Sequence, residues 1–375
     1  MASPFDSVEP QDELGTETSA NAMSSAWHGP LFVIGMWRSG TSLLYALLNK
    51  HPEIALLYEA DLLTLTPMFW IPGRQSRFPR RWEFWNQALS RHGIEPVELR
   101  SGISSVATAA NKAYEQFAAR KGARIGGEKS PNYFDSLTSL AKAFPQARFI
   151  VIWRDPASIC SSVMRAAADA HSWFNRRGIS LRVLMGMEAM RAECDRLARR
   201  RTPIFELQYQ DLVKDPEATM RAICHFLEIP FCSEMASLKG ADRSAIYEGE
   251  HHALVNGESI ASANHPEILP DALKHKIGRY LGAWQRKYGE RWRPLSTVEP
   301  EPPSQLERIF DRVRYRGLRT LDAAIVLMYC FAPIWLLIKF RAFKYKKEEI
   351  RAGKRRAQTP SAESSNHGAI TSRSK

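Results

Sequence analysis

A short loop rich in glycine and hydroxyl side chains is the strongest chemical signal in the sequence. Gly35 and Gly40 enclose the stretch Gly-Met-Trp-Arg-Ser-Gly, and Thr41 and Ser42 follow directly. Glycines let backbone N–H groups converge on an anion, and a following helix adds the positive end of its dipole. The pattern therefore predicts a phosphate site whose donors come from Arg38, Ser39, Gly40, Thr41 and Ser42.

The loop departs from that of nucleotide triphosphatases at one decisive position. In those proteins a lysine after the second glycine contacts the β- and γ-phosphates. Here that position is Thr41, and the cation of the loop is Arg38. The loop is therefore a poor one for ATP hydrolysis, although a P-loop kinase or NTPase stays open as an alternative.

A second anion site is expected at Arg154. The residues 147–153 read as a buried strand, and a helical pattern follows over residues 157–168. Arg154 at the strand end and Ser162 on the helix could give a charge-assisted contact and a hydroxyl to a second phosphate. The alternative is a strand-to-helix turn with a solvated arginine and no binding role.

Strand-like and helix-like stretches alternate along the chain. Apolar strand patterns cover residues 31–35, 147–153 and 204–209, and helical patterns cover residues 43–48, 157–168 and 218–227. Such alternation is typical of α/β proteins with helices on both faces of a parallel sheet. We predict a three-layer α/β sandwich with a mainly parallel central sheet, a P-loop-like phosphate-binding loop and an added C-terminal apolar helix.

Four segments together resemble the PAPS-dependent sulfotransferases, where PAPS is 3′-phosphoadenosine 5′-phosphosulfate. The segment 32–44 is similar to their 5′-phosphosulfate loop, with Trp37 where the family commonly has proline. Arg154 and Ser162 resemble their 3′-phosphate element. The segments 128–134 (Glu-Lys-Ser-Pro-Asn-Tyr-Phe) and 209–216 also match, so the resemblance extends from about Leu31 to Pro230.

The resemblance implies transfer of a sulfuryl group from PAPS to a hydroxyl or amine of a glycan, glycolipid, lipid or peptide, without a metal. Glu59 would be the base, with Asp61 as its rival, and Arg38 and Lys129 would stabilise the developing charge. The implied donor-binding residues are Arg38, Ser39, Gly40, Thr41, Ser42, Arg154, Ser162 and, near the adenosine, Tyr209. Glu53 and His51 read as helix-end residues. A non-catalytic, membrane-anchored nucleotide-binding protein is the remaining alternative.

Charge and composition suggest five regions. Residues 1–29 contain five acids and no lysine or arginine, which predicts a disordered acidic arm without a secretory leader. A sulfotransferase domain over residues 30–293 and a Pro-rich, then basic linker over 294–320 follow. The last two regions are an apolar helix over 321–340 and a basic disordered tail over 341–375.

The C-terminal charge pattern predicts contact with an anionic membrane through residues 321–347, because cations flank an apolar run on both sides. Docking of that helix on the domain or on a second copy is the alternative. The basic tail lacks a nucleic-acid-binding motif, so no nucleic acid is expected. Five cysteines without a C-x-x-C pair favour a reducing, cytoplasmic location. The aromatic and arginine-rich residues 67–85 read either as a substrate lid or as ordinary packing, and the acceptor and oligomeric state stay open.

Overall fold

A computed structural model of the chain describes residues 29–63, 87–94, 106–167, 174, 176–246, 260, 269–289, 292 and 296–331. The structural statements below refer to these residues. The predicted arm over 1–29, except for residue 29, lies outside the described residues. So do the segment 67–85, the predicted apolar helix beyond residue 331 and the predicted tail over 341–375.

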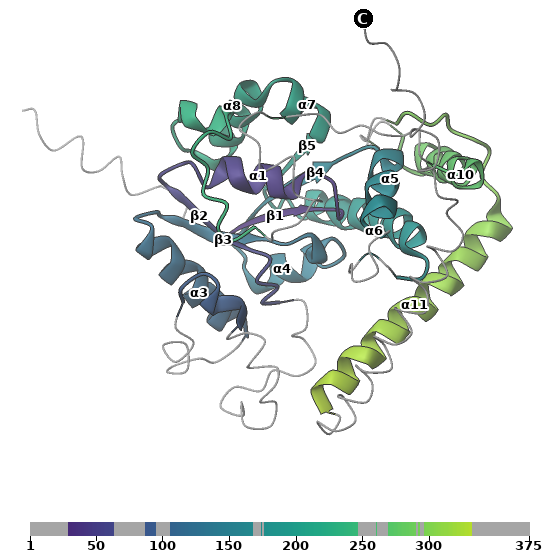
Figure 1. Ribbon diagram of the computed structural model, residues 1–375, viewed down its shortest axis with the longest axis horizontal. Helices are drawn as coiled ribbons and strands as arrows, with labels where there is room; N and C mark the ends of the chain where they lie inside the picture. The colour runs from purple at the N-terminus through teal and green to yellow at the C-terminus, as the bar shows by residue number, and fades with distance from the viewer. Residues whose placement is uncertain are drawn as a thin grey trace, which may run out of the picture.

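A five-stranded parallel sheet forms the centre of the molecule (Figure 1). Its strand order is β2-β3-β1-β4-β5. In that order the strands are β2 (Ile54–Tyr58), β3 (Ile125–Lys129), β1 (Leu31–Gly35), β4 (Arg148–Trp153) and β5 (Ile204–Gln208). β1, β2 and β4 are almost wholly apolar and buried, as expected for strands covered on both faces. The predicted α/β class is confirmed.

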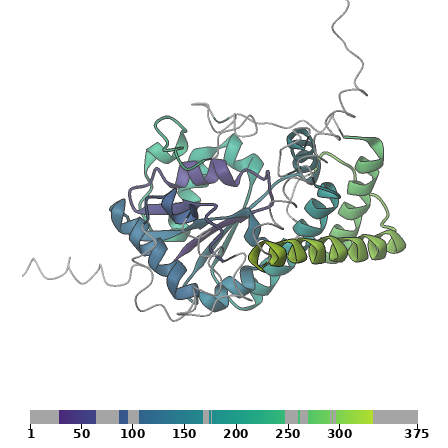
Figure 2. The same ribbon diagram turned by 60° about the horizontal axis from the view of Figure 1, so that its bottom comes forward.

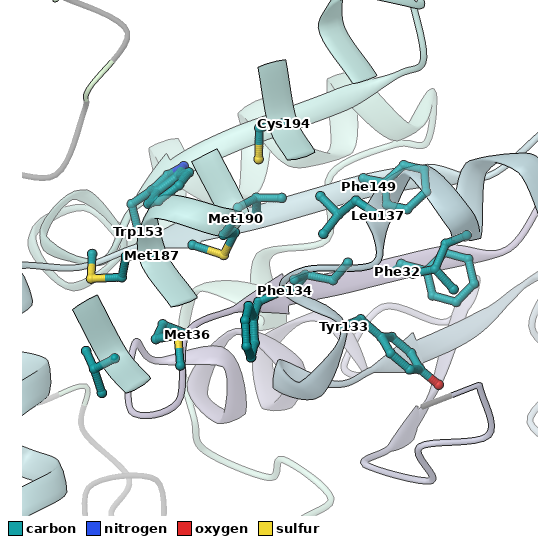
Figure 3. Packing of buried hydrophobic residues seen from close by; sticks show 14 of the residues in the cluster. Phe32, Met36, Tyr133, Phe134, Leu137, Phe149, Trp153, Met187, Met190 and Cys194 are labelled. Carbon is teal, nitrogen blue, oxygen red and sulfur yellow. The ribbon is translucent and has the colours of Figure 1, made fainter. Parts of the chain in front are cut away.

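Each face of the sheet has its own apolar core. Alternate residues of β1 point to opposite faces, so Phe32 and Ile34 belong to one core while Leu31 and Val33 belong to the other. The first core packs against the helices α3 (Val106–Arg120), α4 (Leu137–Ala143), α5 (Pro156–Ala166), α6 (Ile179–Arg199) and α10 (Asp271–Tyr288). Figure 3 shows aromatic and sulfur side chains of this core, including Phe32, Phe149 and Met190. The second core packs against α1 (Thr41–Leu48), α7 (Tyr209–Lys214) and α8 (Pro216–Leu227).

The position of β1 determines where a site can form. β1 pairs with β3 on one side and with β4 on the other. The chain leaves β1 for β2 on one side of the sheet and later continues through β4 and β5 on the other side. Such a change of direction opens a crevice beyond the carboxyl ends of the strands, where α/β proteins bind ligands.

Several elements differ from the sequence-based expectation. Neither the 21-residue α6 nor α10 was predicted. Tyr209 begins α7 rather than ending a strand. The helix α11 (Gln305–Phe331) begins inside the stretch 294–320 that was interpreted as a linker. Of the apolar helix expected over 321–340, the structure describes the part up to Phe331 as the end of α11.

The segment before α11 packs along α10. The backbone N–H of Glu301 donates to the carbonyl of Gly278 at 2.9 Å, and the Glu301 carbonyl lies so close to Gly282 that a Cβ there would be 2.0 Å away. This contact turns the chain from α10 into α11. Figure 2 shows α11 as a long helix along the outside of the molecule. None of the helices in the described ranges combines the length and apolar character needed to cross a membrane.

Candidate active site

The glycine-rich loop is held in its conformation by close packing. Gly40 has φ +103°, a conformation that favours glycine, and a Cβ at Gly40 would lie 2.4 Å from the Tyr209 ring. The N–H of Ser39 donates to the Met36 carbonyl at 3.0 Å, which closes the turn between β1 and α1. The loop therefore requires both the small residue and the aromatic ring beneath it.

The donors of the loop suit an anion. α1 begins at Thr41 without a side-chain cap and without an acidic residue in its first turn, so its N-terminus keeps its positive character. The Ser39 hydroxyl is buried and has no hydrogen-bond partner among the described residues. A phosphate oxygen is a suitable partner for such a donor set.

Two arginines meet beside this loop. The Arg38 side chain donates from Nε to the Ser162 hydroxyl at 3.0 Å, and Arg154 donates from Nη1 to the Arg38 carbonyl at 3.0 Å. Burial and, next, the positive charge of Arg154 lower the pKa of Arg38 to about 10. Burial also lowers the pKa of Arg154. Two guanidinium groups this close together repel each other, and a bound anion would reduce that repulsion.

Tyr209 joins the two predicted phosphate elements. Its ring lies against Gly40 and also 4.1 Å from the Arg154 guanidinium carbon. All the predicted donor-binding residues thus occupy one region at the carboxyl ends of β1, β4 and β5. The structure places Tyr209 beside the loop and Arg154, and its predicted contact with an adenosine stays a prediction.

The predicted base and the predicted catalytic lysine form an ion pair. Lys129 Nζ lies 2.5 Å from Glu59 Oε1, with the Lys129 side chain fully buried and the Glu59 side chain 23% exposed. Burial lowers the pKa of Lys129, and the Glu59 carboxylate opposes that change. Lys129 Nζ also lies 3.4 Å from the Ser42 hydroxyl, which in turn lies 2.8 Å from the Tyr58 hydroxyl. The ion pair is therefore connected directly to the phosphate loop.

The backbone beyond β2 is strained where it carries Glu59. Glu59 has φ +44° and Asp61 has φ +53°, values that non-glycine residues rarely adopt. The Glu59 N–H donates to the Lys129 carbonyl at 2.9 Å, and the Asp61 N–H donates to the Glu128 carboxylate. Strain of this kind persists only when surrounding contacts hold it, and it is concentrated at functional sites.

Asp61, the rival base, is engaged by a polar network that the sequence did not reveal. Its carboxylate accepts hydrogen bonds from the Ser130 hydroxyl and from Asn132 Nδ2, the latter at 2.8 Å. The Trp37 indole donates to Asn132 Oδ1 at 3.0 Å. The unusual tryptophan of the loop is thus connected to the segment 128–134. Although that segment was recognised, nothing in its pattern indicated pairing with Asp61.

Glu128 supports this network from the interior. It is fully buried and accepts hydrogen bonds from the hydroxyls of Tyr114 and Tyr133, each at 2.9 Å. Burial, followed by the nearby charge of Asp61, raises the pKa of Glu128 to about 8. Burial also raises the pKa of Asp61.

The remaining sequence candidates lie apart from this centre. His51 and Glu53 follow α1, which ends at Leu48. His51 Nε2 lies 2.8 Å from the Pro230 carbonyl, and Glu53 pairs with Arg124. Within the described ranges, no group of three or more His, Cys, Asp or Glu residues could hold a metal ion. The described cysteines, Cys160, Cys194, Cys224 and Cys232, are free thiols.

Comparison with known proteins agrees with the geometry. The model of the "Sulfotransferase family" matches residues 30–233. The chain is 31% identical to protein-tyrosine sulfotransferase 1 of Danio rerio over 211 residues, covering 54% of this chain and 53% of the relative. It is 30% identical to protein-tyrosine sulfotransferase 2 of Gallus gallus, covering 53% of this chain and 51% of the relative. The chain thus spans about half the length of these relatives.

A solved structure shares the fold. The sulfotransferase domain of the Synechococcus PCC 7002 olefin synthase superimposes with a TM-score of 0.51 at 20% identity, covering 68% of this chain and 94% of that domain. The family match spans more than half of the chain and contains the loop, Glu59, Lys129, Arg154 and Tyr209. The chain therefore belongs to the sulfotransferase family.

Proposed function

We propose that this protein transfers the sulfuryl group of PAPS to a hydroxyl or amine of an acceptor. The observation that carries the proposal is the connection through Ser42. The Ser42 hydroxyl belongs to the phosphate loop and also lies within 3.4 Å of Lys129, which pairs with Glu59. The loop and the Glu59 carboxylate therefore lie next to each other at the carboxyl ends of the strands. Transfer from an anionic donor requires such proximity.

The residues present suit a donor with two phosphate positions. The loop donors, the α1 N-terminus and Arg38 would hold the 5′-phosphosulfate, with the buried Ser39 hydroxyl as one further donor. Arg154 and Ser162 would hold the 3′-phosphate. When bound, PAPS supplies the activated sulfuryl group that an acceptor oxygen or nitrogen attacks.

The ion pair would divide the remaining work. Lys129 holds the Glu59 carboxylate in an ion pair, and this carboxylate would accept the proton of the acceptor as the acceptor attacks. The positive charges of Lys129 and Arg38 would stabilise the negative charge that develops on the transferred group and on the departing phosphate oxygen. Asp61 already accepts two hydrogen bonds, so Glu59 is the better placed of the two carboxylates.

Donor binding tests the proposal most directly. We expect adenosine 3′,5′-bisphosphate to bind in isothermal titration calorimetry without dependence on Mg²⁺, and Arg154→Ala to abolish the binding. Lys142→Ala is the control, because Lys142 is an exposed residue of α4. Binding of ATP with Mg²⁺ in preference to the bisphosphate would instead support the kinase or NTPase alternative.

The acceptor is identified by transfer itself. Radiolabelled PAPS would be incubated with fractionated lipids, glycans and peptides, and tyrosine-containing peptides come first because both animal relatives are named for that residue. Label incorporation that disappears in Glu59→Gln is the supporting result. Donor binding without transfer to any fraction would favour the non-catalytic alternative. A cytoplasmic location and the absence of a nucleic-acid partner stay predictions.

A further inference from the structure

One face of α11 carries a continuous apolar stripe that is open to solvent. Every large hydrophobic side chain that is exposed in the described part of the chain belongs to this helix, with Leu306 71% and Phe310 73% exposed. Leu306, Ile309, Phe310 and Val313 recur at intervals of three or four residues, and Leu321 returns to the same helical face further along the helix. The members of this apolar stripe are Leu306, Ile309, Phe310, Val313 and Leu321. Gly317 lies on the same face, and a Cβ there would meet nothing within 4 Å.

The opposite face of α11 holds the helix on the domain. Tyr315 and Leu318 pack against the core that includes α6. The acidic residues of the helix point to this side, because Glu307 pairs with Arg279, Asp311 with Lys276, and Asp322 with Arg182. The carboxylates of α11 are therefore used in docking, and the stripe is left without acidic neighbours from its own helix.

Arginines border the stripe. Arg312, Arg314 and Arg316 are exposed, and the structure shows no ion pair for them among the described residues. Successive positions on a helix differ by 100°. Arg312 and Arg316 therefore lie along one edge of the stripe and Arg314 along the other. An apolar band bordered by cations is typical of helices that lie in the surface of an anionic bilayer.

We propose that the apolar stripe of α11 and its bordering arginines bind the surface of an anionic lipid bilayer, with the helix lying in the interface rather than crossing it. This surface, residues 306–321, precedes the segment 321–347 that the sequence pointed to. The charge pattern favours a bilayer over a second copy of the chain, because two copies of this face would bring six arginines together without a carboxylate between them.

The sequence beyond the stripe agrees with this assignment. After Leu321 and Asp322, an apolar run extends from Ala323 to Ile338, and Lys339, Arg341 and Lys344 follow. The apolar stripe and its bordering arginines are thus followed in the sequence by further apolar residues and then by further cations. The ion pair of Arg319 with Asp135, at 2.8 Å, ties the helix to the end of the segment 128–134. A bilayer on the stripe would therefore lie close to the chain that carries Asn132.

Vesicle flotation with the full chain tests the proposal independently of donor binding. We expect wild type to float with vesicles that contain phosphatidylserine and to stay behind with phosphatidylcholine alone. Phe310→Gln with Val313→Gln keeps every charge, including those of the basic tail, and should weaken binding at least about tenfold. Arg312→Gln, Arg314→Gln and Arg316→Gln together should weaken it by about 100-fold.

A matched variant controls for net charge. Arg199, Arg200 and Arg201 are exposed at and beyond the end of α6, and their replacement by Gln removes the same three charges. That variant should float nearly as wild type does, and the melting temperature of each variant shows that it is folded. Unchanged flotation of the Phe310/Val313 variant overturns the proposal. So does a wild-type dimer in light scattering that this variant converts to a monomer while vesicle binding stays the same.

Discussion

Glu59 lies at a strained backbone position and is paired with a fully buried lysine. A carboxylate held in this way keeps its direction without the entropy loss that a mobile side chain would meet on reaching an acceptor. Its exposure of 23% leaves part of the group accessible. The Glu59 carboxylate is thus fixed in position and still partly exposed.

Replacing Glu59 by Gln should separate binding from transfer. The amide keeps the size of the side chain but cannot accept the acceptor proton, so kcat should fall by about 100-fold to 10,000-fold. The affinity for adenosine 3′,5′-bisphosphate should stay within a factor of two or so, because the loop donors are untouched. Steady-state kinetics and calorimetry measure the two quantities. Full turnover by Glu59→Gln with the true acceptor would remove Glu59 from the role of base.

Gly40→Ala probes the contact between the loop and Tyr209. The new methyl group would meet the Tyr209 ring at 2.4 Å in a backbone conformation with φ +103°. We expect the free energy of unfolding to fall by roughly 1–3 kcal/mol and donor affinity to fall with it. Gly240→Ala is a matched control, because Gly240 also has a positive φ, +73°, but has nothing within 4 Å of the added atom. Equal effects of the two substitutions on donor affinity would contradict the packing argument.

The ends of β2 and β3 act together as one support. Glu128 and Lys129 at the end of β3 hold the residues that follow β2, through the N–H of Asp61 and the carboxylate of Glu59. The two tyrosines that donate to Glu128 come from α3 and from the short turn Pro131–Tyr133. The position of Asp61, and with it the chain that carries Glu59, thus depends on a buried carboxyl group at the end of β3.

This carboxyl group predicts a pH dependence of stability. The pKa of Glu128 is raised from 4.5 to about 8. The folded chain keeps a proton that the unfolded chain releases, so the contribution of Glu128 to stability is full below the unfolded pKa and declines as pH rises toward 8. The melting temperature of wild type should therefore decrease relative to that of Glu128→Gln as pH rises through this window. Glu217→Gln, an exposed change, should show a flat difference. A wild-type advantage that grew with pH would be incompatible with a raised pKa.

Local patterns predicted the elements that contain the chemistry, because an apolar run ending in glycine and a following helical period are written in adjacent residues. The strand over 31–35, its loop and the helix after it were found in this way, and so were Arg154 and Ser162. The pairing of Asp61 with Ser130 and Asn132 was not found, because residues far apart in the chain meet there only through strand order. α6 was missed although it is long, since its buried Arg191 and Glu193 interrupt the apolar pattern while pairing with other side chains. The first part of α11, up to residue 320, was interpreted as a linker because its charges mask the stripe.

Across the whole molecule, the segment before α11 is fastened next to the donor site. Asp155 caps α5 by accepting hydrogen bonds from the N–H groups of Ala157 and Ser158, and it also accepts from the hydroxyls of Ser296 and Thr297 at 3.0 Å each. Asp155 directly follows Arg154 and is buried. A single carboxylate therefore connects the segment before α11 to the strand end that carries Arg154.

Thr297→Val removes one of these donors while keeping the shape of the side chain. We expect the free energy of unfolding to fall by about 1–2 kcal/mol, because the buried Asp155 oxygen loses a hydrogen bond. Thr219→Val is the comparison, since the Thr219 hydroxyl also donates, to the Asp215 carbonyl, but at an exposed site. Its effect should stay within about 0.5 kcal/mol in urea unfolding. Equal losses of unfolding free energy in the two variants would show that the hydrogen bond to Asp155 stabilises the fold no more than an exposed hydrogen bond does.

The contact of Gly40 with Tyr209 also affects when, during synthesis, the loop can first bind a ligand. The loop is among the first parts of the domain to leave the ribosome, whereas Tyr209 is added only after the last strand of the sheet. A nascent chain that stops before β5 has the glycines but lacks the ring against which they pack. Because a ligand stabilises only the state that binds it, cellular donor nucleotide would begin to stabilise the nascent protein only after β5 has been made.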